Sequence, residues 1–149
     1  MQVQDFFDIY FENEKLKREA RNYNLGNLID DLKKYPKNAN IEIPPFCLYP
    51  TGITSYRGYY SDLAITYGDS TRALTCGELL NLCKKAVGKK FFGYKGGEFE
   101  MSRNTVVWIA PYGRTTDIVV TGIKDCFDDG SYLEITWKRE GDKTNEQKS

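Results

Sequence analysis

The chain has 149 residues, enough for one domain with a hydrophobic core and too few for two. Its 21 basic residues balance its 21 acidic residues, so no net charge attracts nucleic acid or a membrane, and any anion site must be local. Histidine is absent, which excludes Ser-His-Asp and Cys-His nucleophiles, HExxH metalloproteases and histidine-bearing zinc sites. The 11 tyrosines, 8 phenylalanines and 2 tryptophans exceed what such a core needs and favour a stacking surface.

Residues 1–23 are predicted to form a helical arm. Glu12 to Arg21 is rich in good helix formers and has neither glycine nor proline. The aromatic residues before it are too apolar to stay uncovered, so they are expected to pack on the domain or on a second copy, which favours a homo-oligomer. These residues are Phe6, Phe7, Tyr10 and Phe11.

The cellular compartment of the protein can be predicted from its cysteines and its first ten residues. The thiols are too widely spaced for a paired-cysteine metal motif, so neither a metal nor a cofactor is expected. Residues 1–10 contain two aspartates and no continuous apolar run, which argues against a signal peptide or a membrane span. The sequence therefore predicts a cytoplasmic protein with reduced thiols and no membrane partner, in which Cys83 is a core residue.

A single domain is expected over residues 24–137, and it begins with helix signals. One helix follows the cap residue Asn24, has apolar residues at positions 25, 28, 29 and 32, and ends before Pro36. A second helix starts with a capping box of Thr75 and Glu78 and stops at Gly88. Its predicted buried stripe is Leu79, Leu82, Cys83 and Ala86.

The remaining elements are predicted strands. Alternating or β-branched runs occur at 41–43, 62–66, 98–101, 105–110, 117–123 and 132–137, and the last two should form a hairpin. Residues 46–52 are predicted to be a loop, and the charged residues 138–149 a disordered tail. Together these elements predict the α+β class: a mostly antiparallel sheet with two helices packed on one face, plus the N-terminal helical arm.

Two segments with the same unusual composition fit no core pattern. The run Ser55-Tyr56-Arg57-Gly58-Tyr59-Tyr60 places one guanidinium among three phenol rings, and Phe91 to Gly97 again combines aromatic residues, a cation and glycines. Arginine binds phosphate bidentately, glycines let backbone N–H groups approach an anion, and tyrosines stack on bases. These segments predict a nucleotide pocket, although GxGxxG and GxxxxGK[ST] are absent. The alternative is that the tyrosines are ordinary strand residues and the glycines only turn the chain.

The residues expected to contact a ligand are the cations that would neutralise phosphates and the aromatic residues and glycines beside them. Residues 46–122 carry nine basic and six acidic side chains, a net charge of +3, which agrees with a local anion site. The candidate ligand-binding residues are Tyr56, Arg57, Tyr59, Tyr60, Tyr94, Lys95, Gly96, Gly97, Arg103, Trp108 and Arg114.

The two segments also carry a resemblance. Together with Leu63-Ala64, Gly88-Lys89, Met101, Thr105, Trp108 and Gly113, they resemble a group of small phage-encoded proteins that share an SYRGYY box and a GYKGG box, over about residues 25–123. Small phage proteins without enzymatic equipment are often inhibitors of host defence, and one class, typified by the Thoeris inhibitors, sequesters nucleotide signals. By that analogy the resemblance implies an anti-defence protein of the host cytoplasm.

Three functions are open. The first is a binding protein that sequesters a small phosphate-containing nucleotide signal, cyclic or ADP-ribose-like, without cleaving it. The second is a protein-protein inhibitor of a host nuclease or defence complex that uses the arm and the tyrosine-rich surface. The third is a phosphodiesterase or lyase acting through Glu98, Glu100 or tyrosines. Because no histidine or metal motif supplies an acid, a base or a hydroxide, no catalytic residue is assigned.

Overall fold

The computed structural model describes residues 19, 22–45, 47–57, 59–92, 97–111 and 114–140. Strands dominate these residues, and the two α-helices among them have eight and eleven residues. In chain order the elements are α2 (Leu25–Leu32), β1 (Asn40–Glu42), β2 (Tyr49–Tyr56), β3 (Tyr59–Gly68), the 3₁₀-helix η1 (Ser70–Arg72), α3 (Cys76–Ala86), β4 (Lys90–Phe92), β5 (Glu98–Glu100), β6 (Val107–Ile109), β7 (Ile118–Asp125) and β8 (Tyr132–Arg139).

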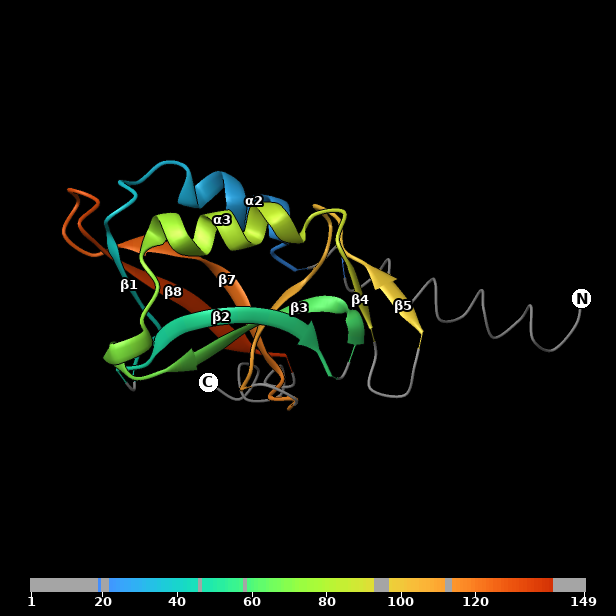
Figure 1. Ribbon diagram of the computed structural model, residues 1–149. Coiled ribbons are helices and arrows are strands. Elements are labelled where there is room, and N and C mark those ends of the chain that lie inside the picture. The colour runs from blue at the N-terminus through green and yellow to red at the C-terminus, as the bar shows by residue number, and fades with distance from the viewer. Residues whose placement is uncertain are drawn as a thin grey trace, which may run out of the picture.

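Six strands form one strongly curled sheet in the order β1-β8-β7-β6-β3-β2. The β2–β3, β6–β7 and β7–β8 pairs are antiparallel, and the β1–β8 and β3–β6 pairs are parallel. The curl brings the two edges together, because Ile43 and Leu48 form an antiparallel bridge in which the Ile43 N–H donates to the Leu48 carbonyl at 2.7 Å. The sheet is therefore nearly closed like a barrel, with the separate β4–β5 hairpin beside it (Figure 1).

The main core lies inside the curl, between the sheet and the two helices (Figure 1). Inner-face residues such as Leu63, Ile65 and Val107 pack against the apolar faces of α2 and α3. The backbone N–H of Leu25 donates to the Thr105 carbonyl at 2.7 Å, so the start of α2 is anchored to the residues directly before β6. The helices consequently cover the end of the curl at which β6 begins.

A second, smaller core occupies the outer face of the central strands. Its buried members are Tyr56, Ala64, Val106, Trp108, Ala110 and Val119. Successive residues of a strand point to opposite faces, so burial of Val107, Trp108 and Ile109 alike means that β6 is covered on both sides. Double-sided burial is usual for parallel pairing, and β6 pairs in parallel with β3.

The local helix predictions are confirmed. Asn24 caps α2 through a hydrogen bond of 2.8 Å from the Asn27 N–H, and Thr75 and Glu78 form the capping box of α3. Gly88 has φ +81°, the left-handed conformation expected where glycine ends a helix. Cys83 is fully buried as predicted, whereas Leu80 rather than Leu82 lies on the buried face of α3.

The predicted fold class was wrong. In the described residues the chain forms a nearly closed, mixed sheet with two short helices, α2 and α3, instead of a mostly antiparallel α+β sheet with two helices packed on one face. Part of the error lies at residues 46–52, which were expected to be a loop although β2 begins at Tyr49. Pro50 and Gly52 lower the strand signal there, and both are tolerated because β2 is an edge strand.

The predictions for the two chain ends fall largely outside the described residues. Residues 1–18, 20–21 and 141–149 are not described, so the predicted helical arm lies almost entirely outside the described residues, and so does most of the predicted tail. The described part shows that β8 continues to Arg139, two residues past the expected domain boundary. In the described ranges, no helix has both the length and the apolar character needed to cross a membrane.

Candidate ligand-binding site

The SYRGYY segment forms the hairpin that joins β2 to β3. Tyr56 pairs with Tyr59, and the Ser55 hydroxyl donates a hydrogen bond to the Tyr60 carbonyl across the two strands. Arg57 is exposed at the connection, and Tyr59 keeps 47% of its surface exposed. Residues 56–60 are called the Arg57 turn below. The turn thus presents a cation and an aromatic ring to solvent next to each other.

The second predicted segment belongs to the β4–β5 hairpin. Its first residues, Phe91 and Phe92, lie in β4, and Gly97 directly precedes β5 with φ +88°. Four residues between them, Gly93, Tyr94, Lys95 and Gly96, lie outside the described residues. The predicted contacts of Tyr94, Lys95 and Gly96 with a ligand therefore stay predictions.

The structure brings the strands that carry the two segments together. The rings of Tyr60 in β3 and Phe99 in β5 have centroids 5.6 Å apart. Phe99 is paired with Phe91 across the β4–β5 hairpin, so both strands of that hairpin are fixed relative to the Arg57 turn. Figure 1 shows β4 and β5 beside the end of β2 and the start of β3. Segments more than thirty residues apart in sequence are thus neighbours at one end of the molecule.

Tyr56 and Trp108 form a buried aromatic pair at the Arg57 turn. Their rings stack with centroids 4.5 Å apart and planes 4° apart, and each residue is 1% exposed. The Tyr56 hydroxyl oxygen accepts hydrogen bonds from the backbone N–H groups of Thr116 and Asp117, both at 3.1 Å. The sequence nominated Tyr56 and Trp108 as ligand contacts, and the structure places both in the outer core. Tyr59, whose ring centroid is 5.9 Å from that of Trp108, is the exposed ring of this stack.

Asp62 is a buried residue of the site that sequence reasoning did not nominate. It is 0% exposed, and its carboxylate accepts a hydrogen bond of 2.9 Å from the Trp108 indole nitrogen. A buried carboxylate is costly unless it is hydrogen-bonded, so this contact holds the Trp108 ring in one orientation. Strand alternation was the signal in the sequence, because it places Asp62 and Ala64 on the same face of β3. Trp108 is the β6 residue that pairs with Ala64.

The two remaining arginine candidates have different surroundings. Arg103 donates to the Asp30 carboxylate at 2.7 Å and to the Gly26 carbonyl at 3.1 Å, so its guanidinium joins the β5–β6 connection to α2. Arg114 is exposed on the β6–β7 connection. That connection also supplies the N–H groups bound by Tyr56, which places Arg114 on a segment attached to the outer core.

The carboxylates considered for catalysis lie on β5. Glu98 and Glu100 are exposed and flank Phe99, and Glu98 forms an ion pair of 3.7 Å with Lys90, which is itself exposed. Such an arrangement is typical of a solvent-facing strand edge. Within the described ranges, acidic and cysteine side chains do not gather in the groups of three that a metal ion requires.

Comparisons with protein-family models, with curated proteins and with solved structures found no match to this chain.

Proposed function

We propose that this protein binds a small phosphate-containing nucleotide at the end of the molecule formed by the Arg57 turn and the β4–β5 hairpin. Arg57 and Tyr59 lie two residues apart on this turn and are both exposed. A guanidinium can bind a phosphate through two parallel hydrogen bonds, and an exposed phenol ring can stack on a base. The turn therefore offers one group for each half of a nucleotide.

The observation that carries the proposal is the contact between Tyr60 and Phe99. This contact sets the β4–β5 hairpin against β3, near the Arg57 turn. Phe92 and Gly97, the described residues on either side of Tyr94, Lys95 and Gly96, belong to this hairpin. The described ends of the two segments are therefore close to each other, and the proposal assigns both segments to one site. In this proposal Lys95 would supply a second cation, which would raise affinity for a molecule with more than one phosphate.

The buried stack beneath the turn favours binding. Tyr59 packs near the ring of Trp108, which is itself fixed by Asp62 and Tyr56. A ring that is already ordered loses little conformational entropy when a base stacks on it. Because this support is part of the outer core, removing the exposed Arg57 should affect the ligand and leave the fold intact.

The proposed role is sequestration, with release of the nucleotide unchanged. The chain has no histidine, and Glu98 at this end is exposed and paired with Lys90. Hydrolysis of a phosphodiester normally needs a general acid and base with pKa values near neutrality, or a metal-bound hydroxide. The resemblance to small phage proteins makes host nucleotide signals the first ligands to test.

One observation favours the alternative of a protein-protein inhibitor. Phe92 in β4 is 72% exposed and belongs to the same end of the molecule as Tyr59. Exposed aromatic side chains that lie near an arginine are the residue types that dominate protein interfaces. In this alternative Phe92 and Arg57 would contact a protein, and no nucleotide would bind.

Calorimetry with cyclic dinucleotides, cyclic ADP-ribose and ADP-ribose tests the proposal. We expect at least one to bind the wild-type chain, and Arg57→Ala to weaken that binding by about 10- to 100-fold, the value of a charge-assisted hydrogen bond. The matched control is Arg72→Ala, which removes an exposed arginine of η1, past the opposite end of β3. It should bind like the wild type.

Two results would contradict the proposal. One is that none of these nucleotides binds the wild-type chain, in which case Phe92→Ala and Arg57→Ala should be tested for loss of a protein partner. The other is turnover: ligand recovered after heat denaturation should be the starting molecule, and product above one equivalent per chain would show catalysis.

A further inference from the structure

A cavity lies inside the curled sheet, at the end opposite the Arg57 turn. Its volume is about 220 Å³. The sheet contributes Tyr67, Ile109, Ile118, Trp137 and Arg139, and the chain that follows β1 contributes Pro44 among its wall residues. These sheet residues come from four neighbouring strands, β3, β6, β7 and β8, and they lie where β3, β6 and β8 end and β7 begins.

The cavity is left open because neither α2 nor β1 extends to the end of the sheet at which β6 and β8 finish. The start of α2 is hydrogen-bonded to residues before β6, whereas the cavity is lined by Ile109 at the end of β6. β1 stops at Glu42, and Pro44 and Pro45 after it have no backbone N–H to continue pairing with β8. β8 nevertheless continues to Arg139, so its last inner-face residues line a space instead of packing against a strand.

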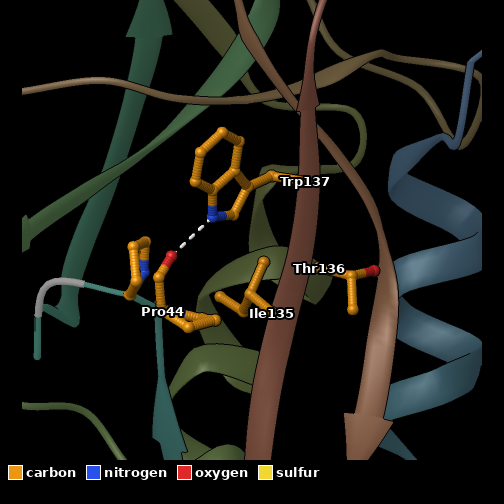
Figure 2. Close-up of a pocket in the computed structure, with 5 residues that line it drawn as sticks. Pro44, Ile135, Thr136 and Trp137 are labelled. Atoms are coloured by element: carbon orange, nitrogen blue, oxygen red, sulfur yellow. Dashed lines mark hydrogen bonds between the residues drawn. The ribbon is translucent and has the colours of Figure 1, made fainter. Parts of the chain in front are cut away.

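Trp137 is held in place at the border of this space. Its indole nitrogen donates a hydrogen bond of 2.7 Å to the Pro44 carbonyl (Figure 2). In Figure 2 the side chains of Ile135 and Trp137 leave β8 on one side, and Thr136 leaves on the other. The hydrogen bond occupies the polar atom of the indole, so the ring presents apolar surface to a ligand.

The polar groups of the cavity are Arg139 and Tyr67. Arg139 is exposed and pairs with Ile118 across β7 and β8, and Tyr67 is half-buried. Across the described residues, no hydrogen bond or ion pair is recorded for the Arg139 guanidinium or the Tyr67 hydroxyl. An arginine beside an apolar space and without a carboxylate partner is suited to bind a carboxylate that enters with a ligand.

The size of the cavity limits the ligand. An apolar cavity of about 150 Å³ accommodates benzene, whereas sites for drug-sized ligands begin at about 300 Å³. A cavity of about 220 Å³ thus suits a single ring or a small fused ring system with a short acidic arm and is too small for a whole nucleotide. We propose that this cavity binds a small aromatic carboxylate, with its ring between Trp137, Ile109 and Ile118 and its carboxylate on Arg139. This site is separate from the proposed nucleotide site, and the inference does not depend on it.

The test uses phenylacetate and indole-3-acetate as probes, with phenylacetamide as the neutral analogue of phenylacetate. Binding is followed by NMR shifts of the backbone amides and of the Trp137 indole, whose signal is assigned with Trp137→Phe. We expect both acids to shift residues that line the cavity. Arg139→Met should weaken phenylacetate binding by about 10-fold or more and leave phenylacetamide binding unchanged.

A matched control and a blocking variant complete the design. Lys138→Met removes the neighbouring cation of β8, which lies opposite Val119 and therefore on the outer face, and it should bind like the wild type. Ile118→Phe should fill the cavity and weaken all three probes. The proposal is overturned if millimolar acid shifts no cavity residue, if acid and amide bind the wild-type chain equally, or if Lys138→Met has the same effect as Arg139→Met.

Discussion

The indole nitrogen of Trp108 donates a hydrogen bond of 2.9 Å to the carboxylate of Asp62, and both residues are at most 1% exposed. Asp62 lies on β3 and Trp108 on β6, so the contact joins the parallel pair in the middle of the sheet. Tyr56, at the end of β2, stacks on the same indole ring. The Arg57 turn therefore begins at a residue that is locked to two other strands, which explains how an exposed turn can hold a defined shape.

Trp108→Phe should be strongly destabilising. The phenyl ring cannot donate to Asp62, so a carboxylate stays buried with a lost hydrogen bond, and we expect the free energy of unfolding to fall by about 3 kcal/mol. The control is Trp137→Phe, which also removes an indole hydrogen bond, but one to the Pro44 carbonyl at a half-buried position. It should cost about 1 kcal/mol. Urea unfolding of both variants checks this, and equal losses would contradict the role assigned to Asp62.

Local signals in the sequence were sufficient for the helices and for the last hairpin. Asn24, Thr75 and Glu78 bind backbone groups three residues away, so their effect depends on the neighbouring sequence alone. The β7–β8 hairpin follows from two alternating runs separated by a turn-forming segment that contains Gly130 at φ +76°. These elements would form in the same places in many folds.

The curl of the sheet and the burial of the candidate site residues depend on contacts between residues that are distant in sequence. Nothing local to β3 indicates parallel pairing with β6, more than forty residues away. That pairing buries Trp108 on Tyr56, so two residues that look like free stacking groups in the sequence are part of the core. Arg103 resembles a free cation for the same reason, because its partner Asp30 lies 73 residues earlier. Arg57 and Tyr59 are exposed, and their contact with a ligand stays a prediction.

Arg103→Ala should affect stability and leave nucleotide binding unchanged. Arg103 and Asp30 are about half exposed, so their ion pair contributes little, but the guanidinium also binds the Gly26 carbonyl. We expect a loss of about 1 kcal/mol in the free energy of unfolding. Arg103→Lys is the control: it keeps the charge, but a single ammonium cannot reproduce the planar fork, so it should recover only part of the loss. A drop in nucleotide affinity comparable to that of Arg57→Ala would instead place Arg103 in the site.

Tyr23→Phe should change how stability depends on alkaline pH. The Tyr23 hydroxyl donates to the Asp31 carboxylate, and burial, followed by that hydrogen bond and the nearby negative charge, raises the pKa of Tyr23 well above its ordinary value of 10.0. Because the folded-state pKa is the higher one, the protonated phenol stabilises the fold fully below pH 10, and this contribution is lost as pH rises above it. We expect Tyr23→Phe to cost about 1 to 2 kcal/mol at pH 7.

The measurement for Tyr23 is the difference in unfolding free energy between the wild type and Tyr23→Phe, taken from pH 7 upward. This difference should shrink above pH 10, where the unfolded chain of the wild type loses the phenol proton and the folded chain keeps it. Tyr49→Phe serves as the control, because Tyr49 is also partly buried, is not among the groups that raise the pKa of Tyr23, and within the described residues its hydroxyl forms no hydrogen bond to a carboxylate. A difference that stays constant with pH would show that the Asp31 contact does not perturb Tyr23.

Cys126 should react slowly with thiol reagents although it is only half-buried. Its Sγ–H donates to the Glu134 carboxylate at 3.1 Å. Partial burial, and after it this hydrogen bond and the charge of Glu134, raise the pKa of Cys126 to about 11 from an ordinary value of 9.0. At pH 8 the thiolate fraction falls about 100-fold, and the thiolate is the reacting species. We expect DTNB to label the exposed Cys47 first and Cys126 much later.

Glu134→Gln isolates the cause of that slow reaction. In a Cys47→Ser background, removal of the Glu134 charge should lower the pKa of Cys126 and speed its reaction with DTNB at pH 8 several-fold, because the thiolate no longer faces an anion. Glu42→Gln is the matched control: Glu42 lies opposite Glu134 in the β1–β8 pair, and its charge is not among those that raise the pKa of Cys126. It should leave the rate unchanged. If both variants react at the wild-type rate, burial alone protects the thiol. If both react faster by the same factor, the combined negative charge of the neighbouring strands sets the reaction rate of Cys126, and the specific contact with Glu134 does not.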